Sequence, residues 1–244
     1  MHPEYNLQVF QTTETLTIAA ASLIVEIAHK SVDATGRFSI ALSGGNTPQQ
    51  LYELLALSPY NQQMPWTETY FFWGDERCVP LEDKRNNAQM AQLALFNKVE
   101  IPPSNIYRIP ANLPPDRAAL TYEKLIKNFF DEEAPHFDLI LLGLGDNGHT
   151  ASLFPGTTVL NEKSQGIRKV FVEEQNEFRI TMTAPLINMA YHILFLVTGE
   201  NKAAILNTIF KSPYLPSQYP AQLVKPQSGK LYWFADSKAA ALLQ

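Results

Sequence analysis

The stretch F-D-L-I-L-L-G-L-G-D-N-G-H-T-A-S-L-F-P-G-T, residues 137–157, runs from an aliphatic segment directly into a glycine-rich polar loop that carries one histidine. A continuous apolar run without a polar face is typical of a strand that is buried on both sides. Gly143 and Gly145 interrupt that run. The loop that holds His149 is therefore predicted to begin where a buried strand ends.

Helix-like and strand-like patterns alternate along the rest of the chain, which predicts an α/β layer fold with a mainly parallel sheet. Helices are expected at 14–30, 48–57, 86–96, 116–130, 201–210 and 237–243, and strands at 37–44, 69–73, 137–142, 168–174, 178–184, 191–199 and 230–236. Thr47 is the expected N-cap of the second helix. Pro48 then suits the first helical position, and Gln50 completes a capping box.

Composition narrows the classes of partner. The chain has 244 residues, of which 45% are hydrophobic, and this is enough to bury a core, so we expect a single domain over residues 1–244. The formal net charge of −5 argues against a general nucleic-acid or membrane-surface role, since both need a basic face. An anionic small molecule would need a local basic pocket instead.

Several features predict a cytoplasmic location. The single cysteine, Cys78, cannot form an internal disulfide, which fits a reducing compartment, and we expect it to be a small, partly buried apolar residue. Neither a signal peptide nor a run of eighteen apolar residues is visible. The proline-rich stretches 102–115 and 213–226 are too short and too varied to be domain linkers, and we expect both to be surface connections.

Three predicted strands end in glycine-marked polar loops, at 43–48, 74–80 and 143–150. Ligands of open parallel sheets bind beyond the carboxyl ends of the strands, so these loops are expected to share one site. Ser43, Gly44 and Gly45 precede a predicted helix and could present N–H groups to a phosphate. The chain has neither a Walker loop nor a dinucleotide fingerprint, so no nucleotide cofactor is expected.

The second loop contains the consecutive charged residues Asp75, Glu76 and Arg77. A solvated charge cluster is the default interpretation. Arg77 could alternatively supply the local positive charge that an anion needs, because its planar guanidinium donates two parallel hydrogen bonds to a phosphate.

His149 allows two interpretations, a histidine that only caps its loop and a general base that takes a proton from water. Ser152 is not expected to be a nucleophile, because the chain has no G-x-S-x-G motif, and its hydroxyl is expected to serve the following backbone turn. The histidines show no metal-ligand spacing, so no metal site is expected.

The motifs S-G-G-N-T-P, W-G-D-E-R-C-V-P, G-L-G-D-N-G-H-T-A-S-L-F-P-G-T, F-R-I-T-M-T and V-T-G-E-N-K-A-A-I-L, taken in this order, resemble the 6-phosphogluconolactonase family over nearly the whole chain. The resemblance implies a Rossmann-like α/β fold with helices on both faces, shared with glucosamine-6-phosphate deaminases. It also implies hydrolysis of 6-phospho-D-glucono-1,5-lactone to 6-phosphogluconate, the second step of the oxidative pentose phosphate pathway, without a metal or an organic cofactor.

The resemblance also implies roles for single residues. His149 matches the histidine that activates water, and Arg77 matches the arginine of the family's D-E-R motif. Arg179 and Lys202 match basic positions at the phosphate end of the substrate, beside the turn formed by Ser43, Gly44 and Gly45.

This chain departs from the family at Asn147, where an aspartate is usual. An amide can orient a neighbouring imidazole but cannot stabilise the imidazolium by charge, so His149 is expected to have a lower pKa or to use another carboxylate such as Asp75. Asn147 and Asp75 are therefore added to the expected catalytic group.

Two alternatives stay open from the sequence. A glucosamine-6-phosphate deaminase would resemble this chain, but such enzymes carry a glutamate five residues after the histidine, where this chain has Phe154, and D-E-Y in place of D-E-R. A non-catalytic sugar-phosphate sensor that regulates transcription would need a basic helix-turn-helix module. The few residues before the first glycine turn are not basic.

Overall fold

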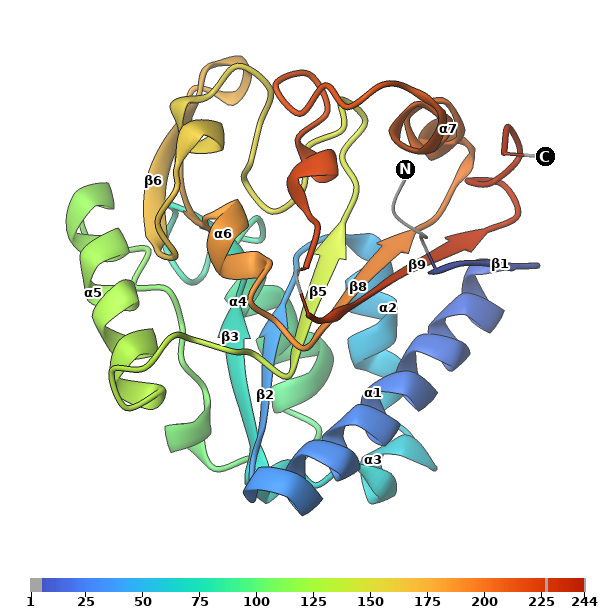
Figure 1. Cartoon of the computed structure of the whole chain (residues 1–244). Helices are drawn as coiled ribbons and strands as arrows, with labels where there is room; N and C mark the ends of the chain where they lie inside the picture. Colours follow the sequence, from blue (N-terminus) through green and yellow to red (C-terminus); the bar gives the residue numbers. More distant parts are fainter. Residues whose placement is uncertain (1–5, 227, 244) are drawn as a thin grey trace.

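The computed structural model describes residues 6–226 and 228–243, so residues 1–5, 227 and 244 of the predicted domain lie outside the described part. Its central sheet has six strands in the order β1-β9-β8-β5-β2-β3, and all neighbouring strands are parallel (Figure 1). These strands are β1 (Asn6–Phe10), β2 (Phe38–Leu42), β3 (Thr69–Trp73), β5 (Leu139–Gly143), β8 (His192–Val197) and β9 (Lys230–Asp236). The predicted α/β fold with a mainly parallel sheet is confirmed.

The helices connect and cover these strands. They are α1 (Thr13–Thr35), α2 (Asn46–Leu55), α3 (Tyr60–Gln63), α4 (Asn87–Ala91), α5 (Pro115–Phe129), α6 (Ala184–Ile187) and α7 (Ala203–Lys211). A π-helical turn, Gln92–Phe96, continues α4. Short 3-10 helices lie at Trp66–Glu68, Pro103–Asn105, Thr158–Asn161, Glu173–Gln175, Glu200–Lys202 and Pro220–Leu223.

The order of the strands places the site. From β1 through β2 to β3 the chain moves toward one edge of the sheet, and from β5 through β8 to β9 it moves back toward the other. Parallel crossovers are right-handed, so helices that follow strands in opposite directions along the sheet are expected on opposite faces. Helix α1 contacts α2, β2 and β9, and α2 contacts β8. The direction reverses between the neighbouring strands β2 and β5. A ligand of such a sheet is expected beyond the carboxyl ends of these two strands.

A second sheet, which is antiparallel, lies beside the carboxyl ends of the central strands. The sequence pattern did not predict this second sheet. It consists of β4 (Asp75–Arg77), β7 (Glu177–Met182) and β6 (Ile167–Val172), in that order. Residues 75–77 were expected to be a polar loop and instead form its edge strand. Helix α5 contacts both β6 and β7 and covers one face of this sheet.

One continuous hydrophobic cluster joins the central sheet to the helices. Trp73 and Trp233 are fully buried in it, and the ring of Trp233 stacks on Phe195 with centroids 3.7 Å apart. Helix α1 is long and apolar enough to span a membrane, a test that core helices also pass; its buried side packs against α2, β2 and β9. The single domain over 1–244 stays a prediction.

Local predictions at helix ends were partly wrong. Helix α1 extends to Thr35 and ends at Gly36 in the left-handed conformation, five residues beyond the expected end. Helix α2 begins at Asn46 after Gly45, and Thr47 is not its N-cap: the Thr47 hydroxyl lies 2.6 Å from the hydroxyl of Thr198. A contact with a distant strand end has replaced the local cap.

Two predictions near the C-terminus were also wrong. Residues 237–242 form turns where a helix was predicted over 237–243, and the carboxylate of Asp236 accepts the Ala239 N–H there. The stretch 213–226 is not only a surface connection, because Ala221 is 1% exposed and packs beneath the loop of His149. Strand β1, which was not predicted, pairs with β9.

Candidate active site

A cavity of about 280 Å³ opens where the loops after β2 and β5 meet strand β4. Eight of the nine predicted site residues line it: Ser43, Gly44, Gly45, Asp75, Arg77, His149, Arg179 and Lys202. The ninth, Asn147, lies behind His149 and lines a neighbouring hollow of about 470 Å³. The fold thus gathers in one place residues that lie up to 159 positions apart in the sequence, between Ser43 and Lys202.

The proton on His149 can be assigned from its contacts. Its Nδ1 lies 2.6 Å from Oδ1 of Asn147, and its own backbone N–H donates to the same Oδ1 at 3.2 Å. A backbone N–H only donates, so the amide atom between them is the acceptor oxygen, and Nδ1 must carry the hydrogen. Nε2 then keeps its lone pair. The neutral imidazole has the tautomer that a general base at Nε2 requires.

Backbone contacts hold the loop of His149 closed. The Gly145 N–H donates to the His149 carbonyl at 2.8 Å, and the Gly148 N–H donates to Gly145 at 3.0 Å. A Cβ at Gly145 would lie 2.0 Å from Cε1 of His149, so only glycine leaves room for the ring. Gly148 has φ +79° and its carbonyl accepts the Ala221 N–H at 2.9 Å.

His149 is held in its neutral form. Burial lowers the pKa of His149 to about 4. The carboxylates of Asp75 and Asp146 raise that pKa, while the cations of Arg179 and Lys202 lower it. Burial is the largest of these causes, so the imidazole can accept a proton at neutral pH. The sequence predicts a lowered pKa for a different reason, the missing charge at Asn147, and that reason stays a prediction.

Two arginines face each other across the antiparallel sheet. Arg77 on β4 is the direct partner of Arg179 on β7. Like charges directly opposite on neighbouring strands repel, so this pair destabilises the apo site and favours an anion. Arg179 is 7% exposed, and neither Nε of the two arginines makes a hydrogen bond within the described chain.

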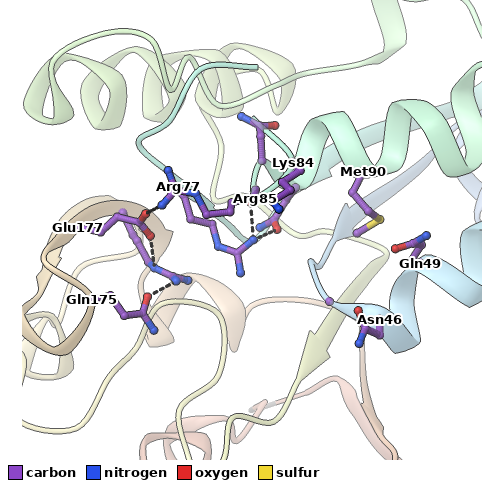
Figure 2. Close-up of a pocket in the computed structure, with 12 residues that line it drawn as sticks. Asn46, Gln49, Arg77, Lys84, Arg85, Met90, Gln175 and Glu177 are labelled. Atoms are coloured by element: carbon purple, nitrogen blue, oxygen red, sulfur yellow. Dashed lines mark hydrogen bonds and ion pairs between the residues drawn. The ribbon is translucent and has the colours of Figure 1, made fainter. Parts of the chain in front are cut away.

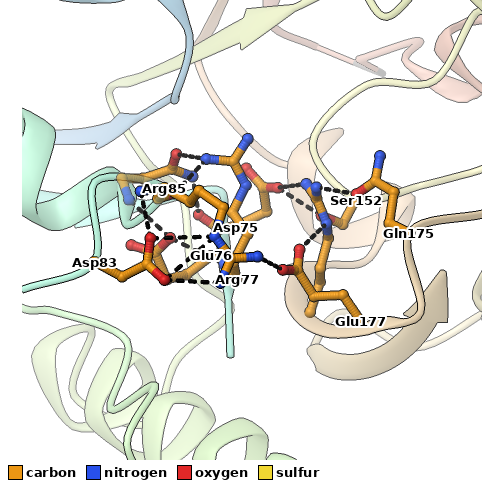
Figure 3. Close-up of polar contacts among 10 residues, drawn as sticks. Asp75, Glu76, Arg77, Asp83, Arg85, Ser152, Gln175 and Glu177 are labelled. Carbon is orange, nitrogen blue, oxygen red and sulfur yellow. Dashed lines mark hydrogen bonds and ion pairs between the residues drawn. The ribbon is translucent and has the colours of Figure 1, made fainter. Parts of the chain in front are cut away.

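Arg77 and Arg179 both line the cavity and are anchored by polar contacts. Figure 3 shows Arg77 beside Glu177 and Arg85. Arg77 donates through Nη1 to the Arg85 carbonyl at 2.6 Å and to Oδ1 of Asn87 at 2.7 Å. Arg179 donates to Gln175 and lies 3.4 Å from Glu177 and 3.8 Å from Asp75.

The acidic residues of the D-E-R motif are not a solvated cluster, contrary to the default interpretation. Asp75 is 5% exposed and accepts the Ser152 hydroxyl at 2.5 Å, so that hydroxyl serves Asp75 in place of the expected backbone turn. Glu76 points away from the cavity and accepts the N–H groups of Asn87 and Ala88 at 2.8 and 2.9 Å. Burial raises the pKa of Glu76 to about 7.

Lys202 reaches the opposite wall of the cavity. Its ammonium pairs with Asp146, which also accepts from the side-chain amide of Asn201 at 3.1 Å. Ser43 precedes the first turn of α2 and is fixed by Tyr52, whose hydroxyl lies 3.0 Å from the Ser43 nitrogen.

Asn87 is a site residue that sequence reasoning missed. It lines the cavity, accepts from Arg77 and donates to the Asp75 carbonyl at 3.0 Å. Its only signal in the sequence is a second asparagine at a predicted helix start. It also lines an outer hollow of about 460 Å³, in which Figure 2 shows Arg77, Lys84 and Arg85. Among residues 6–226 and 228–243, no three His, Cys, Asp or Glu side chains are grouped to hold a metal ion.

The chain is similar to proteins of one family. Residues 11–233 match the family model described as glucosamine-6-phosphate isomerases/6-phosphogluconolactonase. Two relatives are named 6-phosphogluconolactonase: one from Synechocystis is 46% identical over 88% of both chains, and one from Nostoc is 37% identical over 97% of this chain and 98% of its own. A solved structure entitled 6-phosphogluconolactonase from Trypanosoma cruzi matches with a TM-score of 0.88 and 30% identity, covering 100% of this chain and 98% of that one.

Proposed function

Because the chain belongs to the glucosamine-6-phosphate isomerase/6-phosphogluconolactonase family, we propose that it hydrolyses 6-phospho-D-glucono-1,5-lactone to 6-phosphogluconate. The observation that carries the proposal is the pair of contacts from Nδ1 and the backbone N–H of His149 to Oδ1 of Asn147, from which we infer a basic Nε2. His149 lines the same cavity as Arg77, Arg179 and Lys202. A neutral base beside three cations suits a reaction in which water attacks an anionic substrate.

The proposed chemistry needs one base and two proton transfers. His149 takes a proton through Nε2 from the water that attacks C1 of the lactone, and the resulting imidazolium is held at Nδ1–H by Asn147. The same proton then passes to the ring oxygen as the tetrahedral intermediate collapses and the C1–O bond breaks. Asp75 and Asp146 offset the charge of the imidazolium through space.

Stabilisation of the developing oxyanion needs donors that are not already engaged. Gly145 and Gly148 use their N–H groups inside the loop. We therefore assign this task to the other N–H groups of the 143–148 loop and to the guanidinium of Arg77. No metal or organic cofactor enters this scheme.

Arg179 and Lys202 are the residues we assign to the phosphate, together with Ser43, Gly44 and Gly45 at the start of α2. Both cations have carboxylate partners within the chain. Arg179 lies 3.4 Å from Glu177 and 3.8 Å from Asp75, and Lys202 pairs with Asp146. A dianionic phosphate can compete for these cations, since a phosphate accepts several charge-assisted hydrogen bonds at once.

The alternative within the family is a glucosamine-6-phosphate deaminase. Phe154 occupies the position of the deaminase glutamate and is buried against His149, so it supplies no carboxylate for ring opening. The named relatives above favour the lactonase. We also place the activity in the cytoplasm, as the single half-buried cysteine suggests.

The test is an assay of lactone loss, followed by the proton released as the acid forms and corrected for spontaneous hydrolysis. We expect His149→Ala to lower kcat by roughly two to four orders of magnitude, the usual contribution of a general base. His192→Ala is the matched control, because His192 is also half-buried and its Nδ1 lies 2.9 Å from the Asp138 carbonyl, at the opposite end of the sheet.

Three outcomes would contradict the proposal. They are wild-type turnover no faster than the spontaneous rate, equal turnover of the lactone without its 6-phosphate, and ammonia release from glucosamine 6-phosphate. Full activity in folded His149→Ala would show that His149 is not the general base, but it would not contradict the lactone as the substrate.

A further inference from the structure

The aromatic side chain of Phe154 touches two groups of the proposed site. It is 4% exposed and lies five residues after His149 in the sequence. Its ring stacks on the imidazole with centroids 4.0 Å apart and planes 20° apart. Cζ of Arg179 lies 5.3 Å from the centre of the same ring. One apolar side chain therefore packs against both the basic imidazole and a guanidinium of the opposite wall.

The imidazole needs such a contact to keep one orientation. The second side-chain torsion of histidine is broad and roughly two-fold, so rotation by half a turn costs little by itself. That rotation would replace Nδ1 by Cδ2 in front of Asn147 and would remove the 2.6 Å hydrogen bond. The backbone at Gly145 limits the ring on the Cε1 side. The flat face of Phe154 supplies the remaining restraint, on the plane of the ring.

We propose that Phe154 is a positioning residue of this active site: its ring fixes the plane of the His149 imidazole, shields it from water, and steadies the guanidinium of Arg179. The inference rests on the proposed lactonase function, in which Nε2 of His149 must face the attacking water.

Shielding determines the expected pH response. The charged groups that act on His149 are Asp75 from β4, Arg179 from β7, Lys202 from the 3-10 helix Glu200–Lys202, and Asp146 from its own loop. Phe154→Leu removes none of these charges, and Arg179 is the one among them that also loses its contact with the Phe154 ring. Leucine lacks the flat face and admits water beside the imidazole, and burial is what depresses the pKa of His149. The pKa should therefore rise toward its ordinary value.

The experiment compares Phe154→Leu with Phe96→Leu. Phe96 is 8% exposed, and its ring packs against Phe71 and Trp73, so the control loses a buried aromatic ring without touching His149. Initial rates of lactone hydrolysis are measured over a pH range that begins below the wild-type acidic limb, which is expected near pH 4, and extends to neutral pH. In parallel, the tautomer of His149 is read from the ¹⁵N shifts of its ring in both variants and in the wild type.

We expect Phe154→Leu to lower kcat by roughly ten- to a hundredfold, the cost of a misplaced catalytic group. Its KM should rise roughly two- to fivefold through the lost cation–π contact with Arg179. The acidic limb of kcat/KM should move to higher pH, and the Nδ1–H tautomer should lose population. Phe96→Leu should change none of these.

An unchanged tautomer and an unmoved acidic limb in folded Phe154→Leu would overturn the proposal, even if kcat fell. The tautomer measurement does not depend on turnover. If the wild type failed to hydrolyse the lactone, the proposed function would be wrong. The ¹⁵N measurement of the His149 tautomer would still decide whether Phe154 orients His149.

Discussion

Replacing Asn147 by aspartate tests the pairing of amide and imidazole most directly. The amide oxygen lies 2.6 Å from Nδ1 of His149, so Asn147→Asp puts a negative charge almost in contact with the ring. Two unit charges about 4 Å apart attract by about 4 kcal/mol at an effective dielectric constant of about 20. This corresponds to about three pKa units. Desolvation of the new carboxylate and repulsion by neighbouring Asp146 oppose this, so we expect a rise of about one to two units.

The direction of the pH effect follows from the role of His149. A general base is active when neutral, so kcat/KM falls as the pH drops below the pKa of the base. Burial places the pKa of His149 at about 4 in this chain. The acidic limb of Asn147→Asp should therefore move from near pH 4 to about pH 5–6. The assay is the initial rate of lactone hydrolysis at subsaturating substrate, with both proteins measured side by side.

Asn147→Ala is the companion variant. It removes the acceptor at Nδ1, and we expect kcat to fall roughly a hundredfold, less than the ~10⁴-fold cost of enforcing a wrong histidine tautomer in a protease triad. A limb that stays in place or moves downward in Asn147→Asp would refute the pairing. It would instead favour Asp75 or Asp146 as the effective carboxylate, although Asp75 is engaged by Ser152 and Asp146 by Lys202.

Three further predictions follow from the same site. Arg179→Lys and Lys202→Gln should raise KM more than they lower kcat, as steady-state kinetics would show, and unchanged KM in both would exclude them from the phosphate. Gly145→Ala should keep the fold by circular dichroism and lose most of kcat, because its Cβ would stand 2.0 Å from Cε1 of His149. Because the pKa of His149 is depressed in the folded protein, the unfolded chain binds the proton first as the pH drops. The free energy of unfolding should therefore fall by about 3 kcal/mol as the pH is lowered from 6.5 to 4. Urea titrations of His149→Gln should lack that part of the acid sensitivity.

The sequence could predict that the loops of the site lie close together, because the carboxyl ends of parallel strands lie at the same edge of a sheet. The apolar runs before Gly44 and Gly143 marked β2 and β5, and the rule for open sheets brought their loops together. The antiparallel sheet was not predictable in this way. Whether Asp75 begins a loop or an edge strand depends on its pairing with Thr181, more than a hundred residues later, and local pattern carries no such information.

Side-chain partners of distant origin were missed for the same reason. The hydroxyl of Thr47 could satisfy a local cap, but it meets Thr198. The hydroxyl of Ser152 could serve its own turn, but it meets Asp75. The sequence around Asn87 did not mark it as a site residue, because its role depends on a tertiary contact, the hydrogen bond that it accepts from the guanidinium of Arg77. In each case a tertiary contact outweighed an equally good local one.

The hydrogen bond from Ala221 to the Gly148 carbonyl bears on the order in which a newly made chain becomes active. The strand and loop that carry His149 are complete once residue 157 has been synthesised, yet the donor that holds the turn at Gly148 comes 73 residues later than its acceptor. Strand β8 and helix α7 lie between them in the sequence. A nascent chain that ends before residue 221 would contain His149 but would lack the Ala221 N–H that stabilises its loop. Catalytic activity should therefore appear late in synthesis, after most of the strands of the central sheet have been made.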